Sequence, residues 1–236
     1  MFSGLDRCRL GVLAFGDSIT NGGGELQWGV ALQSWALWTA RALGLPFSGY
    51  AVDGAACADV LAQQIPAFER HAAHPQARYE LGCLYIGTND VRGPGWDVGA
   101  FASRFDVALG FLADHCDRVL TVTLPLDLGR PRAPAKITEC NREIEAAAGR
   151  HRALVLDLRA FAARNLVMAD HVHPTAFGQI AIAERALHLL AADGMHVAVA
   201  PSTLISYQTS WLGALRGDLT YVYRHAKTSL RARLRG

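Results

Sequence analysis

Five short apolar runs interrupt the first two thirds of the chain, and each is bounded by glycine, proline or polar residues. A strand that is buried on both faces reads as a continuous apolar run, so these segments predict the strands of a parallel sheet. The predicted strands are residues 10–15, 47–52, 81–86, 119–124 and 153–158.

Longer segments between these runs carry apolar residues at the three- and four-residue spacing of an amphipathic helix. The predicted helices are residues 28–43, 58–68, 101–115, 137–148 and 175–190. Strands that alternate with such helices form βαβ units, which predicts an α/β fold with a parallel sheet and helices on both faces. Ligands of such sheets bind beyond the carboxyl ends of the strands, so the loops after the five strands should share one rim.

The C-terminal segment has a different character. From position 201 on, the chain has six basic residues and one acidic residue, and apolar residues between Leu212 and Leu230 fall near one helical face. We therefore divide the chain into a globular domain, residues 1–195, and a basic amphipathic helical extension, residues 196–236. Three interpretations of the extension stay open: packing on its own domain or on a second copy as a homo-oligomer, contact with an anionic membrane surface, or loose order.

Composition narrows the class of protein. Hydrophobic residues make up 51% of the 236 positions and charged residues 19%, so the chain can bury a sizeable core. A net charge of +2 does not indicate a nucleic-acid partner. We find no apolar run long enough to span a membrane and no signal-peptide pattern. Dispersed cysteines without a CxxC pair predict a cytoplasmic protein with reduced, buried thiols. The cysteines are Cys8, Cys57, Cys83, Cys116 and Cys140.

Chemically distinctive residues directly follow three of the predicted strands. The motif GDSIT places Ser18 after the first strand, VDGAAC places Gly54 after the second, and YIGTND places Asn89 after the third. The segment ADHVHPTAFGQ places Asp170 and His173 just before the last predicted helix. If the strand ends share one rim, we expect these residues to lie together.

Together these residues supply the groups that acyl transfer requires. A serine hydroxyl is a weak nucleophile, so Ser18 needs a base, and His173 can take its proton. A carboxylate must orient the imidazole and balance its charge, and Asp170 lies three residues earlier, within reach of one tight turn. Pro174 suits the first helical position, which would set His173 at the helix entrance.

The tetrahedral intermediate of acyl transfer also needs hydrogen-bond donors. The candidates are the backbone N–H groups of Ser18 and Gly54 and the side-chain amide of Asn89. A glycine at position 54 lets the backbone approach a reacting oxygen closely. We expect Asp90 to serve as a cap rather than in the chemistry. His171 and His173 form an H-x-H pair without further ligands nearby, so we expect no metal site.

The chain resembles the SGNH hydrolase family, also called GDSL. Four blocks match in the expected order: Gly16-Asp17-Ser18, Gly54, Gly87-x-Asn89-Asp90 and Asp170-x-x-His173. The resemblance implies a flavodoxin-like three-layer α/β/α sandwich with a central five-stranded parallel sheet. It also implies hydrolysis of esters or thioesters without metal or cofactor. By this resemblance Ser18 is the nucleophile, His173 the base and Asp170 its partner, with Ser18, Gly54 and Asn89 forming the oxyanion hole.

Two other functions remain open from the sequence. A flavodoxin-like binding module would use SITNGGG to hold a phosphate or nucleotide through backbone N–H groups, which leaves Asp170 and His173 without a role. An acyltransferase would use the same residues with an acceptor other than water. The favoured interpretation is a serine hydrolase whose substrate is a small-molecule acyl ester, with no nucleic-acid partner and no transmembrane segment.

Overall fold

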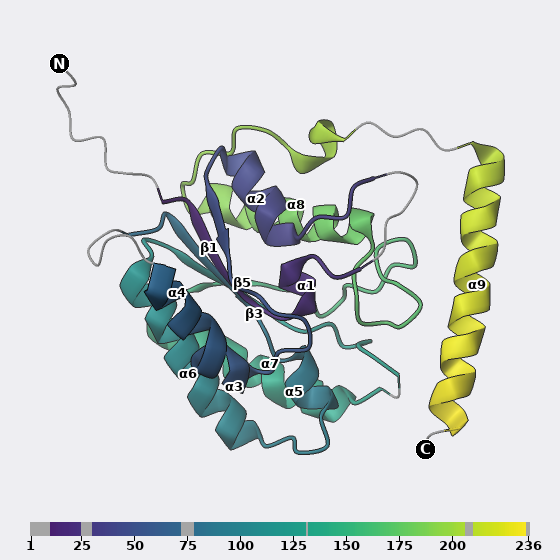
Figure 1. Cartoon of the computed structure of the whole chain (residues 1–236), viewed down its shortest axis with the longest axis horizontal. Coiled ribbons are helices and arrows are strands. Elements are labelled where there is room, and N and C mark those ends of the chain that lie inside the picture. Colours follow the sequence, from purple (N-terminus) through teal and green to yellow (C-terminus); the bar gives the residue numbers. More distant parts are fainter. Residues whose placement is uncertain (1–9, 25–29, 72–77, 131, 206–209, 235–236) are drawn as a thin grey trace.

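The computed structural model describes residues 10–24, 30–71, 78–130, 132–205 and 210–234. Its core is a five-stranded parallel sheet with the strand order β2-β1-β3-β4-β5 (Figure 1). This order is that of flavodoxin-like folds, so the predicted fold class is confirmed. The strands are β1 (Val12–Gly16), β2 (Phe47–Gly49), β3 (Leu81–Tyr85), β4 (Val119–Val122) and β5 (Leu154–Leu156).

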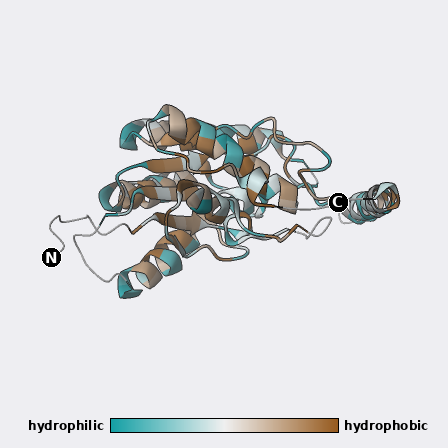
Figure 2. Ribbon diagram, turned by 90° about the horizontal axis from the view of Figure 1, so that it is seen from above, coloured by the Kyte–Doolittle hydropathy of each residue, from teal (hydrophilic) through white to brown (hydrophobic). Residues whose placement is uncertain are grey.

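Helices cover both faces of the sheet and complete three layers (Figures 1 and 2). One face carries α2 (Trp35–Leu43) and α8 (Ala176–Ala192), which pack against each other. The other face carries the larger group of helices: α3 (Cys57–Asp59), the π-helical turn η1 (Val60–Gln64), α4 (Ile65–His71), α6 (Val98–His115) and α7 (Pro134–His151). Shorter elements are α1 (Ser18–Asn21), α5 (Thr88–Arg92) and the 3-10 turn η2 (Pro201–Leu204).

Two predicted helices differ from the observed ones by more than three residues at an end or by an interruption. The helix predicted over residues 28–43 begins only at Trp35, because the Ser34 hydroxyl accepts the Leu37 N–H at 3.2 Å and caps the helix there. Residues 30–34 are not helical, and Trp28 lies outside the described residues. The helix predicted over residues 58–68 is interrupted by the π-helical turn η1, and such turns are frequent at functional sites.

The core lies between the sheet and its two helical layers. All residues of β1, β3 and β4 are buried, as continuous apolar strands predict. The four cysteines within the described residues are free and buried. Burial raises the pKa of the Cys116 thiol to about 12, so this thiol stays protonated at neutral pH. Cys8 lies outside the described residues.

Most of the basic extension forms one long helix, α9 (Trp211–Leu234), beside the α/β body (Figure 1). The part before it contains the 3-10 turn η2. Arg164 links the body to this helix through an ion pair with Asp218 at 2.6 Å. Its guanidinium also lies 5.0 Å from the centre of the Tyr221 ring. The domain boundary after residue 195 stays a prediction. Among the described residues, no helix has the length and apolarity needed to cross a membrane.

Candidate active site

Ser18 lies where β1 passes into the short helix α1. Gly16 ends the strand in a crowded position, because a Cβ there would lie 2.5 Å from the carbonyl oxygen of Tyr85. Asp17 then caps α1, since its Oδ1 accepts the Ile19 N–H at 2.9 Å. Ser18 is the first residue of α1, so its N–H belongs to the first turn, whose N–H groups have no intrahelical acceptor. The strand end therefore presents both a hydroxyl and an N–H at the rim.

A hydrogen-bonded chain of three side chains begins at Ser18. Its Oγ lies 2.9 Å from His173 Nε2, and His173 Nδ1 lies 2.7 Å from Asp170 Oδ2. The His173 side chain is 30% exposed, so it is open to solvent at the rim. The structure thus brings together a nucleophile candidate, a base candidate and a carboxylate that orients the base.

The segment before α8 is folded around the Asp170 carboxylate. Its Oδ1 accepts the N–H of Val172 at 2.9 Å and of His173 at 3.1 Å, which closes the tight turn that the sequence spacing suggested. The predicted place of Pro174 is wrong. The N-cap of α8 is Thr175, and Pro174 precedes it in an antiparallel bridge with Val167, so His173 lies on the loop ahead of the helix.

The electrostatics of the site favour the charged forms of His173 and Asp170, an imidazolium paired with a carboxylate. The hydrogen bond to Asp170 raises the pKa of His173 above its usual value, and burial opposes this only in part. Burial acts against ionisation of Asp170, but its hydrogen bonds with His173 and the backbone hold its pKa below the usual value. Burial raises the pKa of Asp17, which has no exposed surface, to about 7.

The loop that carries Gly54 is tied to the rim on both sides. Asn21 of α1 donates to Asp53 Oδ1 at 2.9 Å, and Asn89 Nδ2 donates to the Ala55 carbonyl at 2.9 Å. Gly54 adopts φ +78°, a conformation that glycine allows at little cost. Since an amide nitrogen carries two hydrogens, Asn89 keeps one beyond its bond to Ala55.

The expected capping role of Asp90 takes the form of a third hydrogen-bonded link next to this loop. Its carboxylate accepts the Cys57 N–H, which lies 3.1 and 3.0 Å from its two oxygens. Cys57 opens α3, so the bond joins the start of that helix to α5. The strand ends that carry Ser18, Gly54 and Asn89 are thereby linked into one rim.

Sequence reasoning missed three buried amide side chains that hydrogen-bond to backbone groups near the rim. Gln64 pairs with both the N–H and the carbonyl of Gly16, and Asn141 pairs in the same way with Leu124. Gln179 accepts the Trp35 N–H and donates to the carbonyls of two residues around α1, Ile19 and Gly23. The only sequence signal for Gln179 is a polar residue inside the apolar segment AFGQIAIA.

Replacing Gln179 with leucine is expected to lower the free energy of unfolding by about 3 kcal/mol. The change leaves three backbone groups without partners, at roughly 1 kcal/mol each. Urea denaturation measures the effect. The matched control is Gln63→Leu on the exposed surface, where a shift of no more than about 0.5 kcal/mol is expected. Equal shifts in the two variants would show that the Gln179 bonds contribute nothing specific.

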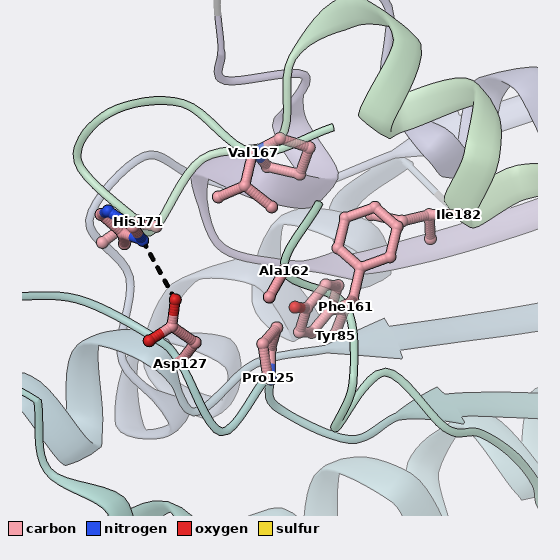
Figure 3. Close-up of a pocket in the computed structure, with 10 residues that line it drawn as sticks. Tyr85, Pro125, Asp127, Phe161, Ala162, Val167, His171 and Ile182 are labelled. Carbon is pink, nitrogen blue, oxygen red and sulfur yellow. Dashed lines mark hydrogen bonds and ion pairs between the residues drawn. The ribbon is translucent and has the colours of Figure 1, made fainter. Parts of the chain in front are cut away.

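A small cavity lies beneath the loop that carries His173 (Figure 3). Its volume of about 10 Å³ suits one water molecule, so it is no substrate pocket. His171 borders it, with Nδ1 3.2 Å from Asp127 Oδ2 and 2.8 Å from an Arg130 nitrogen. Among the described residues, no group of three or more histidine, cysteine, aspartate or glutamate side chains could hold a metal ion.

The fold and the Ser18–His173–Asp170 chain place the protein in the class of three-layer α/β hydrolases. The model of the GDSL-like lipase/acylhydrolase family matches residues 14–180, which is more than two thirds of the chain. The chain therefore belongs to this family, as its resemblance to the SGNH hydrolases indicated, and it is a carboxylic ester hydrolase of the GDSL type. No curated protein matches the chain.

Solved structures share the fold at low sequence identity. LAE5, an α/β hydrolase from the metagenome of Lake Arreo, superposes with a TM-score of 0.61 at 18% identity and covers 76% of this chain and 94% of its own. A member of the lipolytic G-D-S-L family from Veillonella parvula gives 0.60 at 23% identity, with 76% and 97% covered. The acetylxylan esterase Axe2 from Geobacillus stearothermophilus gives 0.58 at 17% identity, with 77% and 96% covered.

Proposed function

We propose that the protein hydrolyses carboxylic esters or thioesters through an acyl-enzyme on Ser18. The observation that carries the proposal is the chain from Ser18 Oγ to His173 Nε2 and from His173 Nδ1 to Asp170, at 2.9 and 2.7 Å. Two of the Axe2 structures are of catalytic mutants in which a serine or a histidine is replaced by alanine, which supports the same pair of residue types here.

In the first half of the reaction, Ser18 Oγ attacks the acyl carbon while its proton passes to His173 Nε2. Collapse of the tetrahedral intermediate breaks the bond to the alcohol or thiol, which leaves with the proton from His173. In the second half, His173 takes a proton from water, and the resulting hydroxide attacks the acyl carbon. Ser18 leaves with that proton and the acid is released. Asp170 stays ionised and balances the imidazolium.

Three donors at the rim serve the oxyanion in this proposal. They are the backbone N–H groups of Ser18 and Gly54 and the side-chain amide hydrogen of Asn89 that Ala55 does not accept. Such donors act when they are held in place before charge develops on the substrate oxygen. The ties of Asn21 and Asn89 to the Gly54 loop give the rim that rigidity.

A fluorophosphonate is expected to label the protein once, on Ser18. Ser18 Oγ attacks phosphorus and fluoride leaves, so the peptide that contains Ser18 gains the mass of the phosphonyl group. Intact-protein mass spectrometry and peptide mapping measure the adduct. Heat-unfolded protein is the control, since labelling requires the assembled Ser18–His173 pair. Labelling of another serine, or none at all, would overturn the proposal.

Replacing Asn89 with alanine is expected to lower kcat by about 10²- to 10³-fold with a smaller change in KM, because one oxyanion donor is lost. Steady-state kinetics on p-nitrophenyl esters measure the effect. The control is Asn21→Ala, which removes the tie on the other side of the Gly54 loop but leaves the Asn89 amide in place. Equal losses in both variants would assign Asn89 to loop structure alone.

The alternative of a phosphate-binding module fits the site less well. The side chain of Asp17 already occupies the start of α1, where its Oδ1 accepts the Ile19 N–H, so this donor is not available to a phosphate. Family membership also favours the hydrolase. Acyl transfer to an acceptor other than water would use the same three side chains, and the ratio of acid to transfer product in the presence of alcohols separates the two reactions.

A further inference from the structure

The long helix α9 exposes a row of large apolar side chains along its length. This outer stripe consists of Leu212, Leu215, Leu219, Val222 and Leu230. The first four recur at three- and four-residue spacing, and Leu230 follows Val222 by eight residues, so all five lie near one helical face. Leu212 is 67% exposed and Leu219 is 63% exposed. Exposed apolar residues scattered singly are ordinary, but a continuous stripe of this length indicates a binding surface.

The contacts described between α9 and the body lie outside the outer stripe. Asp218 and Tyr221 contact Arg164, and His225 Nδ1 lies 3.2 Å from His171 Nε2. These polar and aromatic contacts come from a different side of the helix, and Figure 2 views α9 almost end-on beside the body. The stripe is therefore left open while the helix is held in place by other residues.

A third side of α9 is strongly basic. Together with the segment before α8, it borders a cleft of about 410 Å³. The cationic residues that line this cleft are Arg164, Arg216, Arg224, Lys227 and Arg231. Asp170 is the one carboxylate among its lining residues, and it is already bonded to His173. The cleft therefore offers clustered positive charge next to the loop that carries Asp170 and His173.

We propose that α9 binds the surface of an anionic phospholipid membrane. The outer stripe enters the boundary of the acyl chains, and the cations of the cleft meet the headgroup phosphates. Trp211, 76% exposed, and Tyr223, 66% exposed, are the aromatic residue types that favour the membrane interface. The helix is too polar to cross a bilayer, which agrees with a position on its surface.

Charge decides between this partner and a second copy of the chain. Two α9 helices packed stripe to stripe would place two strongly basic helices side by side, and Asp218, the one acidic residue from position 201 on, already pairs with Arg164. Like charges brought together repel, whereas anionic headgroups attract each of these cations. This inference does not depend on the role of Ser18, so it can hold or fail independently of the proposed function.

Flotation of the full chain with lipid vesicles tests the proposal. Strong binding is expected to vesicles of phosphatidylcholine mixed with phosphatidylglycerol, and much weaker binding to phosphatidylcholine alone. Binding should fall as salt rises, because exposed charges are screened. Equal binding to both kinds of vesicle, or no binding to either, overturns the proposal.

Two variants separate the charges from the stripe. Lys227→Gln with Arg231→Gln is expected to weaken vesicle binding by about 25-fold, at roughly fivefold for each cation. The matched control, Arg41→Gln with Arg70→Gln, removes the same charge from exposed positions of α2 and α4 and should bind as the wild type does. An equal loss of vesicle binding in both double variants would show that binding depends only on the net charge of the protein, which would overturn the proposal.

Leu219→Glu is expected to weaken vesicle binding by at least about tenfold, since it puts a carboxylate into the apolar stripe. The control is Val107→Glu on α6, where the side chain is 56% exposed. Thermal unfolding of both variants shows that they remain folded. If the wild type instead forms a dimer that Leu219→Glu dissociates, and does not bind vesicles, the stripe belongs to a second copy and the membrane proposal fails.

Discussion

Replacing Ser18 with alanine is expected to lower kcat/KM for p-nitrophenyl esters by about 10⁴- to 10⁶-fold, because the nucleophile of the proposed acyl-enzyme is removed. A small residual rate should remain, since Gly54 and Asn89 still offer donors to the substrate oxygen. Esters from acetate to palmitate are the substrates to compare, so that the same assay reports the preferred acyl length.

The control is Ser103→Ala, which removes a hydroxyl from an exposed position of α6. This variant should keep the wild-type rate on every ester. Ser18→Ala should also lose fluorophosphonate labelling while it unfolds near the wild-type temperature, because Ser18 is not part of the buried core. Full esterase activity in Ser18→Ala would show that another residue attacks the ester.

The three central strands of the sheet, β1, β3 and β4, could be predicted from the sequence because they are buried on both faces. The runs at residues 81–86 and 119–124 became β3 and β4 with small changes at their ends. The run at residues 47–52 gave only the short strand β2, although Tyr50 and Val52 still donate to carbonyls of β1. Apolar composition marks a buried strand, but it does not mark where the ladder ends.

The ends of the helices depended on single side chains rather than on periodicity. Apolar spacing continued back to Trp28, whereas the Ser34 hydroxyl fixed the start of α2. In the same way, the sequence predicts Pro174 at the first helical position, whereas the N-cap of α8 is Thr175, one residue later. A cap is a local hydrogen bond, and several residues near each helix could have made it.

Some residues of the candidate site could likewise be predicted from the sequence, and others could not. Ser18, Gly54 and Asn89 could be placed together because the carboxyl ends of parallel strands meet at one edge of the sheet. The buried amides of Gln64 and Gln179 could not be identified, because their partners lie far away in the sequence. Nothing in a local pattern shows that a glutamine on a helix will reach backbone groups this far away in the sequence. The roles of the five site residues in catalysis stay predictions.

Replacing Asp170 with asparagine is expected to lower kcat/KM by about 10³- to 10⁴-fold and to move the acid limb of the pH profile to lower pH. The hydrogen bond that His173 Nδ1–H donates to Asp170 is the main cause of the raised pKa of His173. His173 acts as a base only when neutral, and the neutral fraction rises as pH rises through its pKa. The midpoint of the acid limb should therefore lie above pH 6.5, the ordinary pKa of histidine, in the wild type. In the variant this midpoint should lie at a lower pH than in the wild type.

The pH dependence of kcat/KM, measured for both proteins from mildly acidic to mildly alkaline pH, distinguishes orientation and charge from simple structural support. Asp106→Asn is the matched control, because Asp106 Oδ1 lies 3.0 Å from His151 Nε2 in an aspartate–histidine pair away from Ser18. That variant should keep the wild-type kcat/KM and the wild-type midpoint of the acid limb. A loss of rate in Asp170→Asn without movement of the limb would mean that Asp170 only supports the turn at Val172 and His173. Movement of the limb together with the loss of rate requires its carboxylate to act on the imidazole that takes the proton of Ser18.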